Sequence, residues 1–444
     1  MKRKICILVA LLAVTLFHAK PASAQQRLIV RTTSLSLLKQ ACLLDSCHVV
    51  SALDGTVNQL FLVTVPNLIP IQTVEGLLRL VPGVLDVEQD LLLHIGRNVP
   101  LLNGIPAGLY ERDPVNYYGN SVWAGYAQQP AADIIELPDA RAQFHVTGHA
   151  IVADIDTGVD FSHPALRGVL LQGYDFTRNR PGGNEMADVS GGNTGNCQQC
   201  SSASVNQSTA AVLDQSTAAV LDQSTAAVLD SPQYADFGHG TMVLGVVHLV
   251  APTAMLMPLK AFRSDGTGYT SDIVRAIYFA VQNHANVINM SFDFTSFSGE
   301  LSKAISNAEK SGLICVASAG NDGKAEVVYP AGLSGVMGVA STNDLDERSS
   351  YSNYGPQVVW VAAPGENIVS TFPYDTYASS SGTSFSAPLV SGTAALLLDM
   401  NHSLNPSEAA AAIAHAKLLT SDLGHGRLDV DKALAYIEKV SASE

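Results

Sequence analysis

The chain has 444 residues, of which 47% are apolar and 15% charged, and its formal net charge is −15. A chain of this length and composition can bury a large core, and it fits two domains preceded by a processed leader. The acidic balance and the lack of a basic stripe argue against nucleic acid as a partner.

Residues 1–24 have the pattern of a secretory signal. Three basic residues at positions 2–4 precede an apolar stretch of about thirteen residues, and the small-residue site Ala22-Ser23-Ala24 follows it. The apolar stretch is shorter than the roughly twenty residues that a membrane-spanning helix needs. We therefore expect cleavage after Ala24, export to the periplasm or the medium, and no stable membrane insertion. Loss of the leader removes four basic side chains and changes the net charge to −19.

Five cysteines follow the leader, and four of them form two close pairs. In an oxidising compartment Cys42 and Cys47 could form one disulfide and Cys197 and Cys200 another, which leaves Cys315 unpaired. The spacing "CQQC" at 197–200 is also compatible with half a zinc site, although neither a second pair nor a His-x-x-x-His motif follows it.

Residues 25–96 predict a small α+β unit. Strands are indicated at "RLIVRT", "HVVSALDGT", "LFLVTV" and "GVLDVEQDLLLHI", and helices at "SLSLLKQACLL" and "IQTVEGLLRLV". The order βαββαβ is that of a ferredoxin-like open sandwich. From residue 97 to residue 138 the periodicity fades, which predicts a linker or an irregular N-terminal segment.

Residues 139–440 alternate short apolar strands with helical patterns, which predicts an α/β domain around a mostly parallel sheet. Strands are indicated at "AIVADID", "AMLMPLKAF", "NVINMSF", "LICVASAGN", "GVMGVAST" and "VVWVAAPG", and helices at "DIVRAIYFAVQNHA", "GELSKAISNAEKSG" and "NPSEAAAAIAHA". Because ligands of such sheets bind beyond the carboxyl ends of the strands, Asp156, Ser291 and Asn321 become candidate site residues.

An insertion at about 178–233 interrupts this alternation. It contains "QSTAAVLD" three times without change, at 207–230. A period of eight residues is too short for a solenoid unit. We interpret the repeats as helix in preference to disorder, and as a tolerated surface insertion with little influence on function.

One serine, Ser384 in "SGTSFSAP", stands where a glycine-rich turn leads into an apolar helical pattern. Alone it is compatible with a helix N-cap, but a nucleophile at this place would also benefit from free N–H groups and the helix dipole. A nucleophile needs a base and an orienting acid. His239 lies between two glycines at the head of another helical pattern, and Asp156 ends a strand. Asn321, at a third strand end, could donate its amide to an oxyanion.

These motifs resemble those of the subtilisin-family serine proteases (subtilases). The matching stretches are "DIDTGVDFSHPAL", "GHGTMVLG", "VINMS", "ASAGND", "SGTSFSAPLVSGTAAL" and "GHGRLDVDKAL". The resemblance implies a subtilisin-like three-layer domain in which Ser384 is the nucleophile, His239 the general acid and base, and Asp156 its orienting carboxylate. Asn321 and the Ser384 N–H would form the oxyanion hole. Residues 25–96 resemble, more weakly, the inhibitory propeptide of the family, which also acts as a folding template.

The resemblance also implies the path of a bound peptide and the residues around it. An extended substrate would lie between Ser291-Phe292-Asp293 and Gly266-Thr267-Gly268. A broad apolar pocket for the residue before the cut would be lined by Ala317, Ser318, Ala319, Gly320 and Val328.

The chain departs from the family pattern at several positions. Asp293 stands where the family commonly has glycine, and Leu244 where it usually has alanine. The calcium loop that usually follows the histidine motif has no counterpart, so we expect no metal at that place and no required cofactor, although a structural calcium elsewhere stays possible.

The function predicted from the sequence is that of a secreted, monomeric serine endopeptidase. It would act on polypeptides through an acyl-enzyme and be inhibited by its own propeptide. One alternative is a catalytically impaired subtilase-like binding protein. An esterase is the other, but the chain lacks the G-x-S-x-G elbow of such enzymes.

Overall fold

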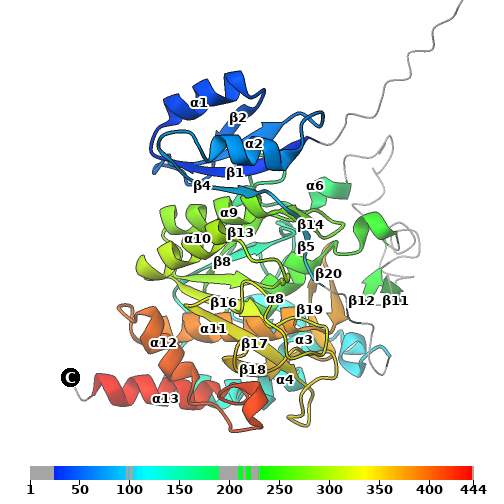
Figure 1. The fold of residues 1–444 in the computed structure, drawn as a ribbon. Coiled ribbons are helices and arrows are strands. Elements are labelled where there is room, and N and C mark those ends of the chain that lie inside the picture. The colour runs from blue at the N-terminus through cyan, green and yellow to red at the C-terminus, as the bar shows by residue number, and fades with distance from the viewer. Residues whose placement is uncertain are drawn as a thin grey trace, which may run out of the picture.

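A computed structural model describes residues 25–96, 99, 104–189, 209–213, 217–221, 229 and 231–442. A small N-terminal unit rests on a larger α/β domain (Figure 1). The predicted signal segment 1–24 and the pair Cys197 and Cys200 lie outside the described residues. None of the helices within the described ranges is both long and apolar enough to cross a bilayer.

The N-terminal unit is a four-stranded antiparallel sheet with two helices. Its elements follow the order β-α-β-β-α-β, and the strands lie in the order β2-β3-β1-β4. A disulfide joins Cys42 to Cys47, and the unit has its own apolar core. The elements are β1 (Gln26–Thr32), α1 (Leu35–Leu44), β2 (His48–Ala52), β3 (Leu60–Val65), α2 (Ile71–Leu78) and β4 (Val84–Gln89).

The last strand predicted for this unit is in fact two strands in different sheets. β4 ends at Gln89, and β5 (Leu92–His94) pairs antiparallel with β14 (Thr267–Tyr269) of the large domain. Asp90 lies at the break, where its carboxylate accepts hydrogen bonds from the Ser271 N–H at 2.8 Å and from the Arg27 guanidinium at 2.7 Å. The chain leaves the first sheet because Asp90 is held at the start of a helix of the other domain.

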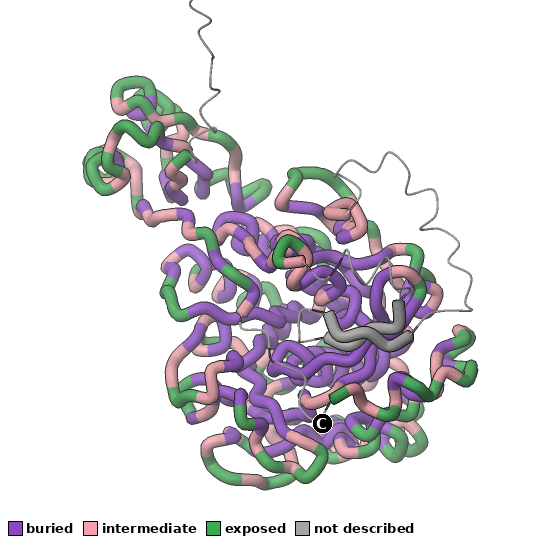
Figure 2. Tube along the Cα trace, turned by 90° about the vertical axis from the view of Figure 1, so that its right-hand side faces the viewer, coloured by how far each residue is buried: buried purple, intermediate pink, exposed green. Residues whose placement is uncertain are grey.

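The large domain is built around an eight-stranded sheet with the order β10-β9-β13-β8-β15-β16-β17-β18. All neighbouring strands from β9 to β18 are parallel, and only the short β10 is antiparallel. Helices α9 and α10 cover one face and α8 and α11 the other, so the predicted three-layer α/β fold is confirmed (Figure 1). Buried residues concentrate in the sheet and in the helices packed on it (Figure 2).

The strands of this sheet are β8 (Ile151–Asp156), β9 (Tyr174–Asp175), β10 (Arg180–Pro181), β13 (Met255–Lys260), β15 (Val287–Met290), β16 (Ile314–Ser318), β17 (Val336–Thr342) and β18 (Val361–Pro364). The helices of the domain are α5 (Leu137–Phe144), α6 (Met186–Val189), η4 (Pro232–Tyr234), α8 (His239–Val250), α9 (Thr270–Gln282), α10 (Gly299–Lys310), α11 (Thr383–Met400), α12 (Pro406–Ile413), η5 (Ser421–Leu423) and α13 (Val430–Ser441).

The segment predicted as a linker forms regular elements in its described residues 104–138. It forms a hairpin and short helices on α8 and on β19 (Ile368–Phe372) and β20 (Thr376–Ser380). Tyr126 explains this packing, because its buried hydroxyl donates to the Gly245 carbonyl oxygen at 2.8 Å and lies 2.9 Å from His248 Nδ1. The elements are η1 (Ala107–Tyr110), β6 (Pro114–Tyr117), β7 (Asn120–Trp123), α3 (Ala124–Ala127) and α4 (Pro130–Ile134).

The first two repeat copies form strands, so the helix interpretation is wrong for them. β11 (Thr209–Leu213) and β12 (Thr217–Leu221) make an antiparallel hairpin, and β12 also pairs with β20. The period of eight fits this geometry, because a five-residue "TAAVL" strand and a three-residue connection complete one copy. The third copy lies outside the described residues except for Leu229. The hairpin extends the sheet whose strand β20 leads to Ser380 and Ser381 in the cleft.

Deleting repeat copies tests whether the hairpin matters. Removal of residues 207–214 leaves two identical copies that can form the same hairpin, so we expect the melting temperature to stay within about 1 °C. Removal of 207–222 leaves one copy and no hairpin. We expect it to cost about 1 kcal/mol, or roughly 2–4 °C in melting temperature. Equal melting temperatures for both deletions, measured by calorimetry, would show that the hairpin is dispensable.

Candidate active site

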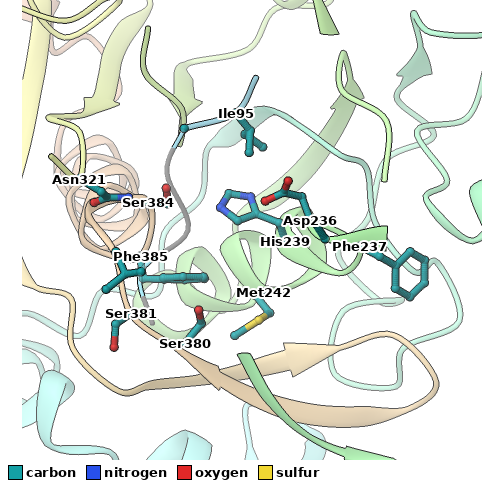
Figure 3. Close-up of a pocket in the computed structure, with 13 residues that line it drawn as sticks. Ile95, Asp236, Phe237, His239, Met242, Asn321, Ser380, Ser381, Ser384 and Phe385 are labelled. Carbon is teal, nitrogen blue, oxygen red and sulfur yellow. The ribbon is translucent and has the colours of Figure 1, made fainter. Parts of the chain in front are cut away.

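Three functional side chains come from three different elements of the large domain. Asp156 is the last residue of β8, His239 the first residue of α8, and Ser384 the second residue of α11. His239, Ser384 and Asn321 line one pocket (Figure 3). The Asp156 carboxylate contacts the His239 ring. The pocket is also lined by Ile95, Gly96, Val99, Ala235, Asp236, Phe237, Met242, Ser380, Ser381 and Phe385.

The Asp156 carboxylate fixes the His239 ring. Nδ1 of His239 lies 2.8 Å from Oδ1 and 2.9 Å from Oδ2 of Asp156, whose side chain is fully buried. The Thr157 N–H donates to the same carboxylate at 2.6 Å. An imidazole bound at Nδ1 presents its other nitrogen to the cleft, where it can accept a proton.

The surroundings of His239 favour its charged form. Burial lowers the pKa of His239, but the carboxylates of Asp156, Asp236 and Asp154 outweigh this effect and raise the pKa to about 9. A neutral imidazole is the form that can take a proton from a nucleophile. The site therefore gains its working base as the pH rises toward 9.

Ser384 is not a helix N-cap. The cap of α11 is Gly382, and no side chain caps this helix. The Ser384 hydroxyl donates to the Ser291 carbonyl oxygen at 3.1 Å, and the Ser291 hydroxyl donates to the Ser384 carbonyl oxygen at 2.8 Å. The His239 ring faces Ser384 across the pocket (Figure 3).

Asn321 lies beside Ser384 with a fixed amide orientation (Figure 3). Its Oδ1 accepts hydrogen bonds from the Thr383 N–H at 3.0 Å and from the Thr383 hydroxyl at 2.9 Å. Because the amide oxygen is held in this way, the NH2 group is oriented as a donor. The Ser384 N–H lies in the first turn of α11, where N–H groups have no carbonyl partner one turn earlier in the helix. Together they provide donors for an oxyanion formed next to Ser384.

The cleft already contains an extended peptide segment of the chain itself. β5 runs antiparallel to β14 with Leu93 opposite Gly268, and the Ile95 N–H donates to the Gly266 carbonyl oxygen at 2.9 Å. The predicted stretch Gly266-Thr267-Gly268 thus binds a strand through its backbone. The other predicted wall, Ser291 to Asp293, directly follows β15 of the large sheet.

Four of the residues predicted to line an apolar pocket are buried in the described structure. Ala317, Ala319 and Val328 are fully buried in the hydrophobic core, as is the polar Ser318 of β16. Val328 therefore packs inside the domain. Phe292 is also fully buried. Gly320 faces the carboxylate of Asp293 where open space was expected.

Glu185 is a site residue that the sequence analysis missed. Its buried carboxylate accepts hydrogen bonds from the Gly238 N–H at 2.8 Å, from the Thr157 hydroxyl at 3.2 Å and from the Thr241 hydroxyl. Glu185 thus joins the turn after Asp156 to the start of the His239 helix. It lies in a glycine-rich loop without a motif, so no local pattern marks it. Burial raises its pKa to about 8.

The histidine helix continues without interruption. α8 runs from His239 to Val250, and β13 begins at Met255. Within the described ranges no group of three or more His, Cys, Asp or Glu side chains is arranged to hold a metal ion.

The fold and this geometry fit the class of serine hydrolases. A sequence profile of the Subtilase family matches residues 148–434, and the chain belongs to this family. Thermitase of Thermoactinomyces vulgaris is 33% identical over 291 residues, which are 65% of this chain and 89% of thermitase. The thermostable alkaline protease of Halalkalibacterium halodurans is 40% identical over 176 residues, which cover 37% of this chain but only 48% of that protein.

A solved structure shares the fold over most of the chain. Fervidolysin from Fervidobacterium pennivorans, described as a keratinolytic enzyme related to subtilisin, superposes with a TM-score of 0.69 and 20% identity. The match covers 93% of this chain and 61% of fervidolysin. At this identity the likeness concerns the fold alone.

Replacing Asp236 tests the electrostatic account of His239. Asp236→Asn removes one of the carboxylates that raise the pKa of His239. We expect the acid limb of kcat/KM, with its midpoint near pH 9, to move to lower pH by up to about one unit. The pH profile of peptide hydrolysis by the mature enzyme measures this shift. Asp139→Asn, an exposed change on α5, is the control, and equal midpoints for all three proteins would contradict the account.

Replacing Phe385 tests its position beside the oxyanion site. Its ring is 5.6 Å from the His239 ring. We expect Phe385→Met to lose activity in peroxide, because a sulfoxide would disturb donors whose loss costs about 10²–10³ in kcat. Phe385→Leu removes the ring without adding sulfur and should resist like wild type. Equal inactivation rates for the three enzymes would place residue 385 away from the oxyanion.

Proposed function

We propose that this protein is a serine endopeptidase that hydrolyses peptide bonds through an acyl-enzyme on Ser384. The observation that carries the proposal is the arrangement of Asp156, His239 and Ser384 in a cleft that holds an extended peptide segment. The names of its relatives, thermostable alkaline protease and thermitase, agree with this activity.

In the proposed reaction the Ser384 hydroxyl attacks the carbonyl carbon of the scissile bond. His239 takes the hydroxyl proton and then gives it to the leaving amine, while Asp156 holds the ring and stabilises the imidazolium. Asn321 and the Ser384 N–H donate to the oxygen on which negative charge develops. A water molecule, deprotonated by His239, then attacks the ester and releases Ser384.

We further propose that residues 25–96 are an inhibitory propeptide and folding template. The N-terminal unit docks on the start of two helices through its carboxylates. Asp90 accepts from the Ser271 N–H in α9, and Glu88 accepts from the Glu300 N–H in α10 at 3.2 Å. Carboxylates at helix N-termini meet unpaired N–H groups and the positive end of the dipole. Arg31 adds a salt bridge to Glu300. These contacts favour the formation of both helices against the sheet.

The processing site that fits this arrangement is the bond after Gly96. Ile95 and Gly96 line the same pocket as Ser384, His239 and Asn321, and Ile95 is held by the Gly266 carbonyl oxygen. The segment 92–96 thus reaches the triad as a substrate would. The predicted signal at residues 1–24 supports export of the precursor, and we expect the mature enzyme to be a secreted monomer.

Loss of the nucleophile tests both the activity and the processing. Ser384→Ala should leave the full precursor uncut and reduce casein hydrolysis by at least 10³-fold, because the acyl-enzyme cannot form. N-terminal sequencing and mass spectrometry of the secreted protein measure processing. Ser403→Ala, an exposed change beyond α11, should process after Gly96 like wild type.

Two results would contradict this proposal. Normal trimming of Ser384→Ala expressed alone would exclude self-processing. Absence of casein hydrolysis by wild type, together with no labelling of Ser384 by an organophosphate, would instead favour an impaired binding protein.

A further inference from the structure

One carboxylate lies where the cleft should receive the side chain before the scissile bond. Asp293 Oδ1 is 2.8 Å from the place that a Cβ on Gly96 would occupy, and Oδ2 is 3.0 Å from the same place on Gly320. The Asp293 side chain therefore lies between the end of the N-terminal segment and the wall of the cleft. Glycine at position 96 leaves room for it.

The Asp293 carboxylate is buried without a partner of opposite charge. The residue is 9% exposed, and in the described part of the chain its side chain makes no hydrogen bond or ion pair. Burial, followed by the neighbouring carboxylates of Asp322 and Glu326, raises the pKa of Asp293 to about 7. A buried carboxyl group without a partner is costly, and a positively charged group would relieve that cost.

The position of Asp293 changes what the pocket can accept. Any side chain at position 96 would place its Cβ 2.8 Å from Asp293 Oδ1, so the carboxylate has to turn aside for every residue except glycine. A large apolar side chain would then bury the turned carboxylate further without any hydrogen bond. A lysine or arginine side chain would reach the same carboxylate and donate to it. Sites with buried polar groups discriminate strongly against ligands that leave those groups unpaired.

We infer that Asp293 determines the specificity of the cleft for the residue before the scissile bond, and that it favours Lys or Arg over large apolar residues. Glycine is accepted because it has no side chain to collide with the carboxylate. This inference rests on the proposed endopeptidase function and adds its substrate class, polypeptides cut after basic residues.

Peptides that differ only in the residue before the cut test the inference. The processed full-length enzyme is given matched fluorogenic peptides with Lys or Leu at that position. We expect wild type to cleave the Lys peptide with at least tenfold higher kcat/KM. In Asp293→Asn, which keeps the size of the side chain, this ratio should fall at least tenfold. Glu326→Gln removes a nearby charge outside the pocket and should keep most of the preference.

A second readout uses the precursor itself. Gly96→Lys and Gly96→Leu carry the same backbone strain, because residue 96 has a φ of +129°, so their difference reports the pocket alone. When Asp293 is present, we expect Gly96→Lys to process faster than Gly96→Leu. When Asp293→Asn is added, the two variants should process at equal rates.

An unchanged ratio of kcat/KM for the Lys and Leu peptides in Asp293→Asn, or a wild-type preference for the Leu peptide, overturns the inference. Peptide hydrolysis in the same experiment would still support the proposed function. Wild type that cleaves no peptide and whose Ser384 is not labelled overturns the function and the inference together.

Discussion

The pairing of Asp156 with His239 is the interaction on which the site depends, and it requires two backbone segments to approach very closely. A Cβ on Gly240 would lie 2.2 Å from the Gly158 carbonyl oxygen, so only glycine lets the histidine helix rest on the turn after Asp156. Glu185 ties the same two segments together through Thr157 and the Gly238 N–H. Asp156 is thus held at the end of a strand of the parallel sheet, and His239 is held at the start of the helix that packs against this strand end.

The N-terminal unit binds the large domain at two kinds of place, the starts of two helices and the strand β14. Its carboxylates bind the starts of α9 and α10, while β5 occupies the strand-binding edge of β14. One set of contacts stabilises the helices that cover the sheet, and the other fills the cleft. The folding assistance and inhibition that we propose for this unit would therefore have a common structural basis, the passage of the chain from β4 to Gly96 beside Ser384 and His239.

Asp293 shows how a single departure from a family pattern can change a binding site without changing the catalytic machinery. The residues that hold Ser384, His239 and Asn321 do not include Asp293, so a carboxylate can be introduced beside Gly320 without a change in their hydrogen bonds. The cost is a buried group whose charge is unfavourable until a partner arrives. Such a cost is acceptable at a site whose purpose is to bind that partner.

The sequence by itself determined the features that are encoded locally. Periodic apolar strands predicted the parallel sheet, and short motifs around Asp156, His239, Asn321 and Ser384 identified the site residues, because strand ends and helix starts carry their own residue patterns. Only the tertiary structure decided which distant segments meet. It placed β5 on β14, the repeat strands beside β20, Tyr126 under α8 and Glu185 between two site loops. It also placed the Asp293 carboxylate between Gly96 and Gly320. These outcomes depend on pairings between residues far apart in the chain, and no local period or motif specifies such pairings.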